Sequence, residues 1–205
     1  MHKKTELLLI GAGGHCRSCI DLISCIPDFG IAGVVDRDGS DLKELMGHDV
    51  IGTDSNLEVL LGNFNQVHIT IGQIKTPKIR INLFNRAKSY GAKFPLIVSP
   101  TAYLSLTAKI GEGTVLMHLT IVNSSAEVGK NCIINNKALI EHDSIIGPHC
   151  HISTGALVNG GVVIEDGCFV GSGAIIHEGV KIGGNSIIGA GQVVKTDIAS
   201  NTVVK

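Results

Sequence analysis

Residues 132–158 read CIINNKALIEHDSIIGPHCHISTGALV, and an aliphatic side chain recurs at every sixth position of this stretch. The spacing continues without a break in both directions, so that all seventeen sixth positions from Val98 to Val194 are Val, Leu or Ile. An α-helix repeats about every 3.6 residues and a strand about every two, so neither explains this period. A coil with three flat faces and one hexapeptide on each face does explain it. We therefore predict a left-handed parallel β-helix.

A second series of positions supports this prediction. Residues two apart on a strand share a face, so the residue two before each aliphatic should also line the interior. Most of these residues are small: Ala102, Ala108, Thr114, Thr120, Ala126, Cys132, Ala138, Ser144, Cys150, Ala156, Cys168, Ala174 and Ser186. Glycine often follows the aliphatic residue, at Gly111, Gly129, Gly147, Gly171, Gly183 and Gly189. We expect the chain to bend at these glycines, with positive φ.

Composition limits the class of protein. A chain of 205 residues accommodates two small domains, which we place at residues 1–97 (a small Rossmann-like α/β domain) and 98–205 (the β-helix). The net charge of −1 and the lack of a basic run argue against a nucleic-acid partner. No apolar stretch reaches the ~18 residues of a membrane span, and the apolar part of MHKKTELLLIGAGG is too short for a signal peptide. We expect a cytoplasmic protein without membrane insertion.

The N-terminal part alternates between short apolar strands and segments of helical periodicity. Strands are expected at residues 6–10, 31–35, 67–71 and 93–97, with a short segment around 50–52, and helices at 17–26, 54–61 and 78–90. This alternation is typical of a small parallel sheet with helices on its faces.

The cysteines are predicted to be structural. Cys132, Cys150 and Cys168 are 18 residues apart, which is one full coil, so they should stack inside the prism as small apolar side chains. Cys16 and Cys19 form a C-x-x-C pattern where a loop enters a helix, and without a matching cluster elsewhere a redox role is disfavoured.

A glycine-rich loop, Gly11-x-Gly13-Gly14, lies between the first expected strand and the first expected helix. Backbone N–H groups at a helix N-terminus attract phosphate, and glycines let it approach closely. The dinucleotide fingerprint G-x-G-x-x-G requires glycine where this chain has Cys16, which disfavours NAD and leaves a nucleoside diphosphate open. Asp36 follows the second strand and can accept hydrogen bonds from a ribose or a base. A tight turn without a ligand remains the alternative.

His142 lies in the segment Leu139-Ile140-Glu141-His142-Asp143 and belongs to neither inward series, so it should face outward or lie at a corner. A carboxylate bonded to one ring nitrogen of a histidine fixes the tautomer and raises the basicity of the other nitrogen, as a general base requires. A solvated surface histidine is the alternative that spacing leaves open.

The motifs taken in order resemble those of the sugar O/N-acyltransferases of the sialic acid O-acetyltransferase (NeuD) family, which includes PglD-like nucleotide-aminosugar N-acetyltransferases. The resemblance covers essentially the whole chain. It is carried by Gly11-Ala12-Gly13-Gly14-His15, Asp36, Ile71-Gly72, Asn136-x-x-Leu139-Ile140-Glu141-His142-Asp143, Ile152-Ser153 and Phe169-Val170-Gly171.

The resemblance implies an acetyl-CoA-dependent transfer in which His142 is the general base and Asp143 increases its basicity. It implies nucleotide-sugar contacts at Gly13, Gly14, His15, Asp36, Arg37 and Gly72, and acetyl-CoA contacts at His151, Ser172 and Ala190. It also implies a homotrimer in which neighbouring subunits share the active site, and no metal is required. Because the unbroken hexapeptide register leaves no room for an inserted loop, the walls of the active site should come from the N-terminal lobe and a neighbouring subunit.

The expected reaction is N-acetylation of a nucleotide-linked 4-amino-4,6-dideoxy sugar in bacterial surface-glycan biosynthesis. O-Acetylation of sialic acid or another sugar is the main alternative, and the sequence leaves the base of the nucleotide open. More remote alternatives are a zinc carbonic anhydrase built on the same helix, which needs a His-x-x-x-x-His pair that His142, His149 and His151 do not form, and a non-enzymatic binding scaffold.

Overall fold

The computed structural model describes residues 4–205, and the chain divides into two compact units. The first unit contains the chain up to Gly72 and then Lys78–Pro95, and the second contains Gln73–Pro77 and Leu96–Lys205. The short segment Gln73–Pro77 thus belongs with the second unit, although the residues on both sides of it belong to the first. Among the described residues, no helix combines the length and the apolar character that crossing a membrane requires.

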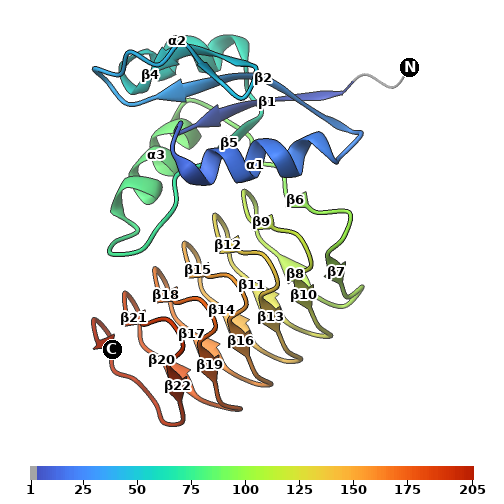
Figure 1. The fold of residues 1–205 in the computed structure, drawn as a ribbon, viewed down its shortest axis with the longest axis vertical. Helices are drawn as coiled ribbons and strands as arrows, with labels where there is room; N and C mark the ends of the chain where they lie inside the picture. The colour runs from blue at the N-terminus through green and yellow to red at the C-terminus, as the bar shows by residue number, and fades with distance from the viewer. Residues whose placement is uncertain (1–3) are drawn as a thin grey trace. The chain divides into compact units, whose positions relative to one another are not determined.

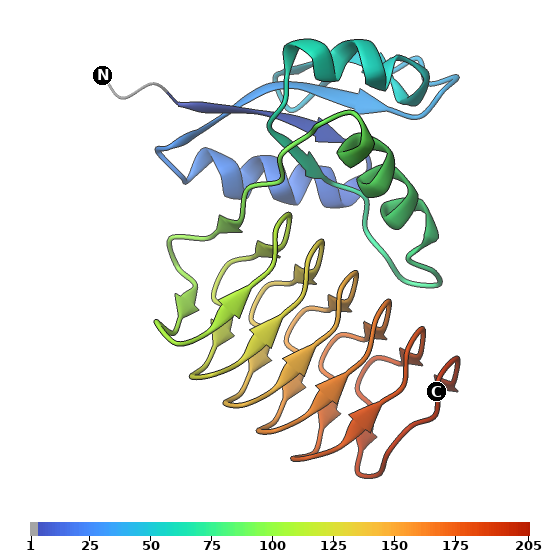
Figure 2. The same ribbon diagram turned by 180° about the vertical axis from the view of Figure 1, so that it is seen from behind.

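The first unit is a mostly parallel sheet in the order β3-β4-β2-β1-β5 (Figure 1). The strands are β1 (Thr5–Ile10), β2 (Phe29–Asp36), β3 (Glu44–Leu45), β4 (His48–Thr53) and β5 (Val67–Ile69), and β3 pairs antiparallel with β4. The helices are α1 (Gly14–Ser24), the short 3-10 helix η1 (Asp54–Asn56), α2 (Leu57–Asn63) and α3 (Lys78–Ser89). Leu8 and Ile10 of β1 pack with α2 and α3 in one apolar cluster. Helix α1 covers the opposite face of the sheet (Figures 1 and 2).

Three expectations for this unit need correction. Helix α1 begins at Gly14, so the glycine-rich loop itself forms its first turn, three residues earlier than expected. The edge strand β3 was not predicted, because Glu44–Leu45 is too short to carry an alternating pattern. The expected strand at residues 93–97 does not form: Lys93 makes an isolated bridge with Gln66, and Ile97 begins the first strand of the second unit.

The second unit is the predicted left-handed parallel β-helix. Within residues 97–194, seventeen two-residue strands each end on one of the aliphatic residues spaced six apart. The first face carries β6 (Ile97–Val98), β9 (Val115–Leu116), β12 (Ile133–Ile134), β15 (His151–Ile152), β18 (Phe169–Val170) and β21 (Ile187–Ile188), with β23 (Val203–Val204) at its end. The second face carries β7 (Tyr103–Leu104), β10 (Ile121–Val122), β13 (Leu139–Ile140), β16 (Leu157–Val158), β19 (Ile175–Ile176) and β22 (Val193–Val194). The third face carries β8 (Lys109–Ile110), β11 (Glu127–Val128), β14 (Ile145–Ile146), β17 (Val163–Ile164) and β20 (Lys181–Ile182).

Each strand up to Val194 pairs in parallel with the strand 18 residues away, as Leu139 does with Leu157 and Ile121. The aliphatic and small series together form one buried cluster along the prism, which confirms that both face inward. The last coil is two residues shorter, because Ile187 pairs with Val203.

One column of small residues has a role beyond filling space. Along one corner of the prism, each inward residue carries a proton donor that bonds the backbone carbonyl 13 or 15 residues ahead. The donors, with their distances to these carbonyls, are Thr114 (2.7 Å), Cys132 (3.2 Å), Cys150 (3.1 Å), Cys168 (3.3 Å) and Ser186 (3.0 Å). The three stacked cysteines are buried free thiols, as predicted, but they also act as weak hydrogen-bond donors to the corner.

The glycines after the aliphatic residues are not the positions of positive φ that we expected. Positive φ occurs three residues after the aliphatic, for example at Ser125 (φ 58°) and Lys137 (φ 61°). The glycine directly after the aliphatic is required by close approach of the next coil instead. A Cβ placed on Gly129 would lie 2.5 Å from the nitrogen of Pro148, which is closer than real Cβ atoms come.

We predict opposite outcomes for two substitutions on either side of strand β11. Gly129→Ala should destabilise the protein by about 1–3 kcal/mol, because the added methyl forces two coils apart. Ser125→Gly should leave stability unchanged or raise it, because glycine adopts the left-handed conformation at no steric cost. Thermal unfolding of both variants tests this, and a Gly129→Ala variant as stable as the wild type would contradict the close-packing explanation.

Candidate active site

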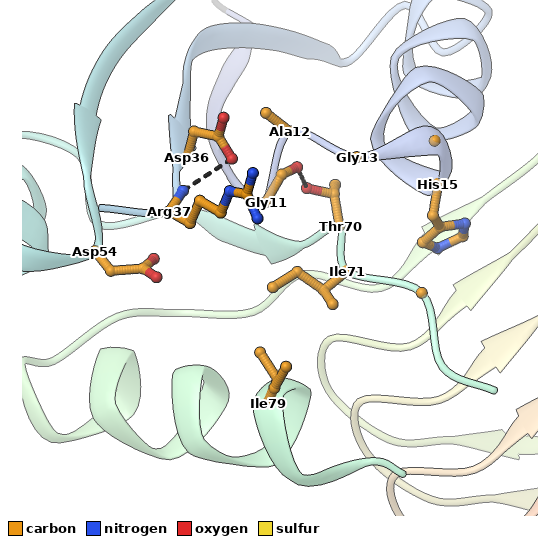
Figure 3. Close-up of a pocket in the computed structure, with 12 residues that line it drawn as sticks. Gly11, Ala12, Gly13, His15, Asp36, Arg37, Asp54, Thr70, Ile71 and Ile79 are labelled. Carbon is orange, nitrogen blue, oxygen red and sulfur yellow. Dashed lines mark hydrogen bonds between the residues drawn. The ribbon is translucent and has the colours of Figure 1, made fainter. Parts of the chain in front are cut away.

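A cavity of about 470 Å³ opens in the first unit at the carboxyl ends of its parallel strands. It lies where the chain order reverses, since β2 and β4 lie on one side of β1 and β5 on the other. All six predicted nucleotide contacts line it, namely Gly13, Gly14, His15, Asp36, Arg37 and Gly72. The wall is completed by Gly11, Ala12, Asp54, Thr70, Ile71 and Ile79, of which Gly11, Ala12 and Ile71 were part of a motif (Figure 3).

The glycine loop is built to receive a group from outside the protein. Gly11 has φ 108°, and a Cβ there would overlap the side chain of Ile71, so this glycine is required by the fold. At Gly13 and Gly14, in contrast, an added Cβ would meet no protein atom within 4 Å. No side chain caps the N-terminus of α1, and its first turn contains no acidic residue. The loop and helix end therefore offer backbone N–H groups and positive potential to an anion such as a phosphate.

Cys16 occupies the position of the third glycine of the dinucleotide fingerprint, and its side chain points into the core. The residue is fully buried, and burial raises the pKa of its thiol to about 11, against a smaller opposing effect of a hydrogen bond with Thr70. The Thr70 hydroxyl in turn donates to the carbonyl of Gly11 at 2.6 Å, which ties the end of β5 to the loop (Figure 3). Burial likewise raises the pKa of the Cys19 thiol. Both cysteines are packing residues, because a thiol with a raised pKa is a poor nucleophile.

Three carboxylates follow the parallel strands near this pocket. Asp36 accepts hydrogen bonds from the backbone N–H of Arg37 at 2.8 Å and from the Ser40 hydroxyl at 2.6 Å. Asp54, at the end of β4, lines the pocket although it was expected only as the start of a helix. Burial, followed by the nearby charges of Asp38 and Asp36, raises the pKa of Asp54. The signal for Asp54 was present in the sequence, because it follows a parallel strand as Asp36 does.

In the second unit, His142 lies at the corner between β13 and β14, outside both inward series as predicted. Its Nδ1 lies 2.9 Å from Oδ2 of Asp143, and the two side chains are 55% and 67% exposed. Asp143 has φ 60° and occupies the left-handed position that recurs at every sixth residue from Gly113 to Gly191. Its backbone N–H donates to the carbonyl of Ser124 in the preceding coil at 3.1 Å. The backbone position of Asp143 is therefore fixed by the turn of the prism.

Several groups around His142 favour its protonated form. The hydrogen bond with Asp143 raises the pKa of His142, and the charges of Asp143, Glu141 and Glu178 add to this effect. Glu141 is held in place because it accepts a hydrogen bond from the Asn123 amide at 2.8 Å. The pKa of the imidazole is thus above its ordinary value, and Nδ1 lies against a carboxylate.

Sequence reasoning missed Gly160, which lies 18 residues after His142 and directly against its ring. A Cβ at Gly160 would lie 2.7 Å from both Cε1 and Nε2 of His142, so a larger residue would displace the imidazole. Nε2 has no hydrogen-bond partner within residues 4–205. The signal was again present, because the 18-residue register places the Gly160-Gly161 pair above the His142-Asp143 pair.

The three predicted acetyl-CoA contacts lie on another part of the prism. Ser172 and Ala190 are exposed and stack on successive coils at the corner between the first and second faces. His151 is 7% exposed on the first face, and its ring lies edge-on to Phe169. His142 therefore stands one corner away from Ser172 and Ala190 in the same chain.

Gln73, which no motif identified, fixes the orientation of His151. Its backbone carbonyl oxygen lies 2.7 Å from Nδ1 of His151, so this nitrogen carries the proton. Nε2 then accepts from the Asn135 amide at 3.2 Å. The Gln73 amide donates to the carbonyls of Gly167 and Cys168 at 3.1 and 3.2 Å. Among residues 4–205, no three His, Cys, Asp or Glu side chains come together in a way that could hold a metal ion.

Both units of the chain are similar to known proteins. Residues 6–87 match the family of the PglD N-terminal domain, and residues 161–195 match the hexapeptide repeat of succinyl-transferase. The structure of PerB from Caulobacter crescentus in complex with CoA and GDP-perosamine is 28% identical, with a TM-score of 0.89 over 99% of this chain and 94% of that one. In its N-terminal domain, its hexapeptide repeats and its whole fold, the chain is similar to sugar acyltransferases of the PglD and NeuD type.

Two further solved structures resemble this chain over nearly its whole length. The acetyltransferase domain of PglB from Neisseria gonorrhoeae is 29% identical, with a TM-score of 0.89 over 98% of this chain and 96% of that one. WeeI from Acinetobacter baumannii is 25% identical, with a TM-score of 0.85 over 98% and 97% of the two chains. No curated protein sequence matches this acyltransferase significantly.

The structure predicts how the two carboxylates beside His142 differ in effect. Because the hydrogen bond with Asp143 is the largest cause of the raised pKa of His142, Asp143→Asn should move the titration of His142 to lower pH. Glu141→Gln should move it in the same direction but less, since Glu141 acts only through its charge. NMR titration of the imidazole in both variants tests this. An equal shift in the two variants would contradict the role given to the hydrogen bond.

Proposed function

We propose that this acyltransferase transfers the acetyl group of acetyl-CoA to the amino group of a nucleotide-linked sugar, with His142 as the general base. The observation that carries the proposal is the His142–Asp143 pair at 2.9 Å, which engages Nδ1 and leaves Nε2 with no hydrogen-bond partner within residues 4–205. The neighbours support the reaction class, because PerB was solved with CoA and GDP-perosamine and the PglB domain is an acetyltransferase. A 4-amino-4,6-dideoxy sugar is the proposed acceptor.

In this proposal, the pocket of the first unit holds the nucleotide. Gly13, Gly14 and His15 receive the diphosphate at the N-terminus of α1, Asp36 and Arg37 contact the nucleoside, and Gly72 borders the sugar. The uncapped helix end and the absence of acidic residues in its first turn favour a dianion there.

His142 moves the proton. Its Nε2 accepts a proton from the amine as the nitrogen bonds to the carbonyl carbon of the thioester, and the proton is returned to the sulfur when the carbon–sulfur bond breaks. Asp143 keeps the proton on Nδ1, so that Nε2 is the basic atom throughout. The coenzyme supplies the activated acetyl group, and His151, Ser172 and Ala190 are proposed to contact it.

We also propose a homotrimer whose subunits meet at the second face of the prism. The outward residues of this face are all apolar: Tyr103, Ile121, Leu139, Leu157, Ile175 and Val193. Tyr103, Ile121 and Val193 are 58%, 41% and 50% exposed in the single chain. The third face, in contrast, carries charged residues such as Lys109, Glu127 and Lys181. A trimer also explains why His142 and the residues proposed for acetyl-CoA lie at different corners, because two subunits can then complete one site.

Since acetyl-CoA and nucleotide sugars are cytoplasmic metabolites, we propose that the enzyme acts in the cytoplasm, in bacterial surface-glycan biosynthesis.

His142→Ala should fold and bind acetyl-CoA normally but lose about 100- to 10,000-fold in kcat, because only the proton transfer is removed. Turnover with acetyl-CoA and a panel of UDP-, GDP- and dTDP-linked aminosugars measures this. His149→Ala, which removes a histidine at a different corner, is the matched control and should keep its activity. A His142→Ala enzyme with nearly normal kcat would rule out the proposed mechanism.

Two matched substitutions test the subunit interface. Ile121 and Ile145 are both outward residues of two-residue strands, and they are 41% and 46% exposed. Ile121→Lys should dissociate the trimer and reduce activity, because it places a charge in the apolar face. Ile145→Lys, on the charged face, should remain trimeric. Light scattering after size-exclusion chromatography gives the mass, and a wild-type protein that is monomeric and fully active would refute the trimer.

A further inference from the structure

The pocket of the first unit contains one carboxylate with no structural partner. The Asp38 carboxylate already has partners within the protein, because its oxygens accept hydrogen bonds from the backbone N–H of Ser55 at 3.1 Å and from the Ser55 hydroxyl at 2.8 Å. Asp36 already accepts from Arg37 and Ser40. The Asp54 carboxylate accepts no hydrogen bond from residues 4–205, is half-buried and lines the cavity. A half-buried ionised carboxylate favours a ligand that brings hydrogen-bond donors.

The order of the strands indicates which part of a nucleotide reaches Asp54. Strands β1, β2 and β4 are parallel neighbours, so their carboxyl ends lie in a row, about 4.8 Å from one strand to the next. The phosphate-receiving loop follows β1, Asp36 ends β2, and Asp54 follows β4. A nucleotide whose phosphates lie on the loop therefore passes its ribose over Asp36 and places its base beside Asp54.

The walls beside Asp54 suit a flat ring. Figure 3 shows the Asp54 carboxylate directed toward the middle of the pocket, with the Arg37 side chain on one side and Ile71 and Ile79 on the other. A guanidinium group stacks on aromatic rings, and the two isoleucines offer an apolar surface for the opposite face of the ring. The carboxylate is then left at the edge of the base, where its hydrogen-bonding groups lie.

Resting on the proposed nucleotide site, we propose that Asp54 is the residue that selects the base, and that the base is guanine. A carboxylate accepts two parallel N–H groups, and guanine presents such a pair on its Watson–Crick edge, from its ring N1–H and its exocyclic amino group. Uracil and thymine present one N–H flanked by two carbonyl oxygens, which a carboxylate repels. Their binding would leave the half-buried charge of Asp54 with at most one N–H donor.

The electrostatics of the pocket agree with this assignment. Burial and the charges of Asp38 and Asp36 raise the pKa of Asp54, against a smaller opposing effect of Arg86. Hydrogen bonds from Thr53 and Ser55, in contrast, hold the pKa of Asp38 below its ordinary value. Of these two carboxylates, Asp54 is the one whose negative charge is poorly compensated, and two N–H donors from a base would compensate it.

Titration calorimetry of the full-length protein with GDP, UDP and dTDP tests the assignment without any acetyl transfer. We expect GDP to bind at least about tenfold more tightly than UDP or dTDP, because each hydrogen bond to a charged group is worth about that factor or more. Asp54→Asn should remove or reverse this preference, since the amide can pair with one N–H and one carbonyl of uracil. Asp38→Asn is the control and should leave the GDP-to-UDP ratio unchanged, because Asp38 does not line the pocket.

The outcomes separate this inference from the proposed function. If UDP binds the wild-type protein as tightly as GDP, or if Asp54→Asn weakens both nucleotides by the same factor, Asp54 does not read the base and the inference is wrong. The proposed acetyl transfer would then still stand. If no nucleoside diphosphate binds, both the base assignment and the nucleotide-sugar acceptor are overturned.

Discussion

The parallel hydrogen bonding between coils, repeated every 18 residues, is the constraint on which the second unit depends. Each strand donates and accepts along the prism axis, as when Leu139 N–H donates to the carbonyl of Ala156 at 2.9 Å. Because the repeat is constant from Ile97 to Val194, residues 18 apart form straight columns inside and outside the prism. Every feature of the proposed catalytic corner follows from its column: the basic histidine, the left-handed aspartate and the glycine pair above them.

The first unit obeys a different constraint, which is the common edge formed by the carboxyl ends of parallel strands. The glycine loop, Asp36, Asp54 and Thr70 follow four different strands and meet at this edge. The arrangement concentrates negative side chains and uncapped N–H groups within one pocket. It therefore suits an elongated ligand with an anionic end and a donor-rich end, whereas the exposed corner of the prism suits proton transfer.

The sequence predicted the prism well because its signal is geometric. A period of six specifies inward positions almost without ambiguity, and the buried state of Ile140, Cys150 and their column-mates confirms it. The six residues predicted to contact the nucleotide line one pocket, because the motifs that contain them follow parallel strands. Gly160 and Asp54 belong to no motif and were missed. The 18-residue register places Gly160 beside His142, and Asp54 follows a parallel strand, so both could have been predicted from their positions. Gln73 could not have been predicted, since its hydrogen bonds with His151 and with the Gly167 and Cys168 carbonyls depend on how a loop between two secondary-structure elements folds back.

The lack of a side chain at Gly160 has a consequence for how such a fold acquires chemistry. The left-handed position of a turn tolerates aspartate, so a His-Asp pair could be placed at many corners of the prism at little conformational cost. What makes one corner suitable is the absence of a side chain in the coil above, where His142 extends its ring over bare backbone. A designer who wishes to move the reactive centre along the prism must therefore move a glycine by the same number of coils. The glycine in the next coil is therefore as necessary to the site as the imidazole itself.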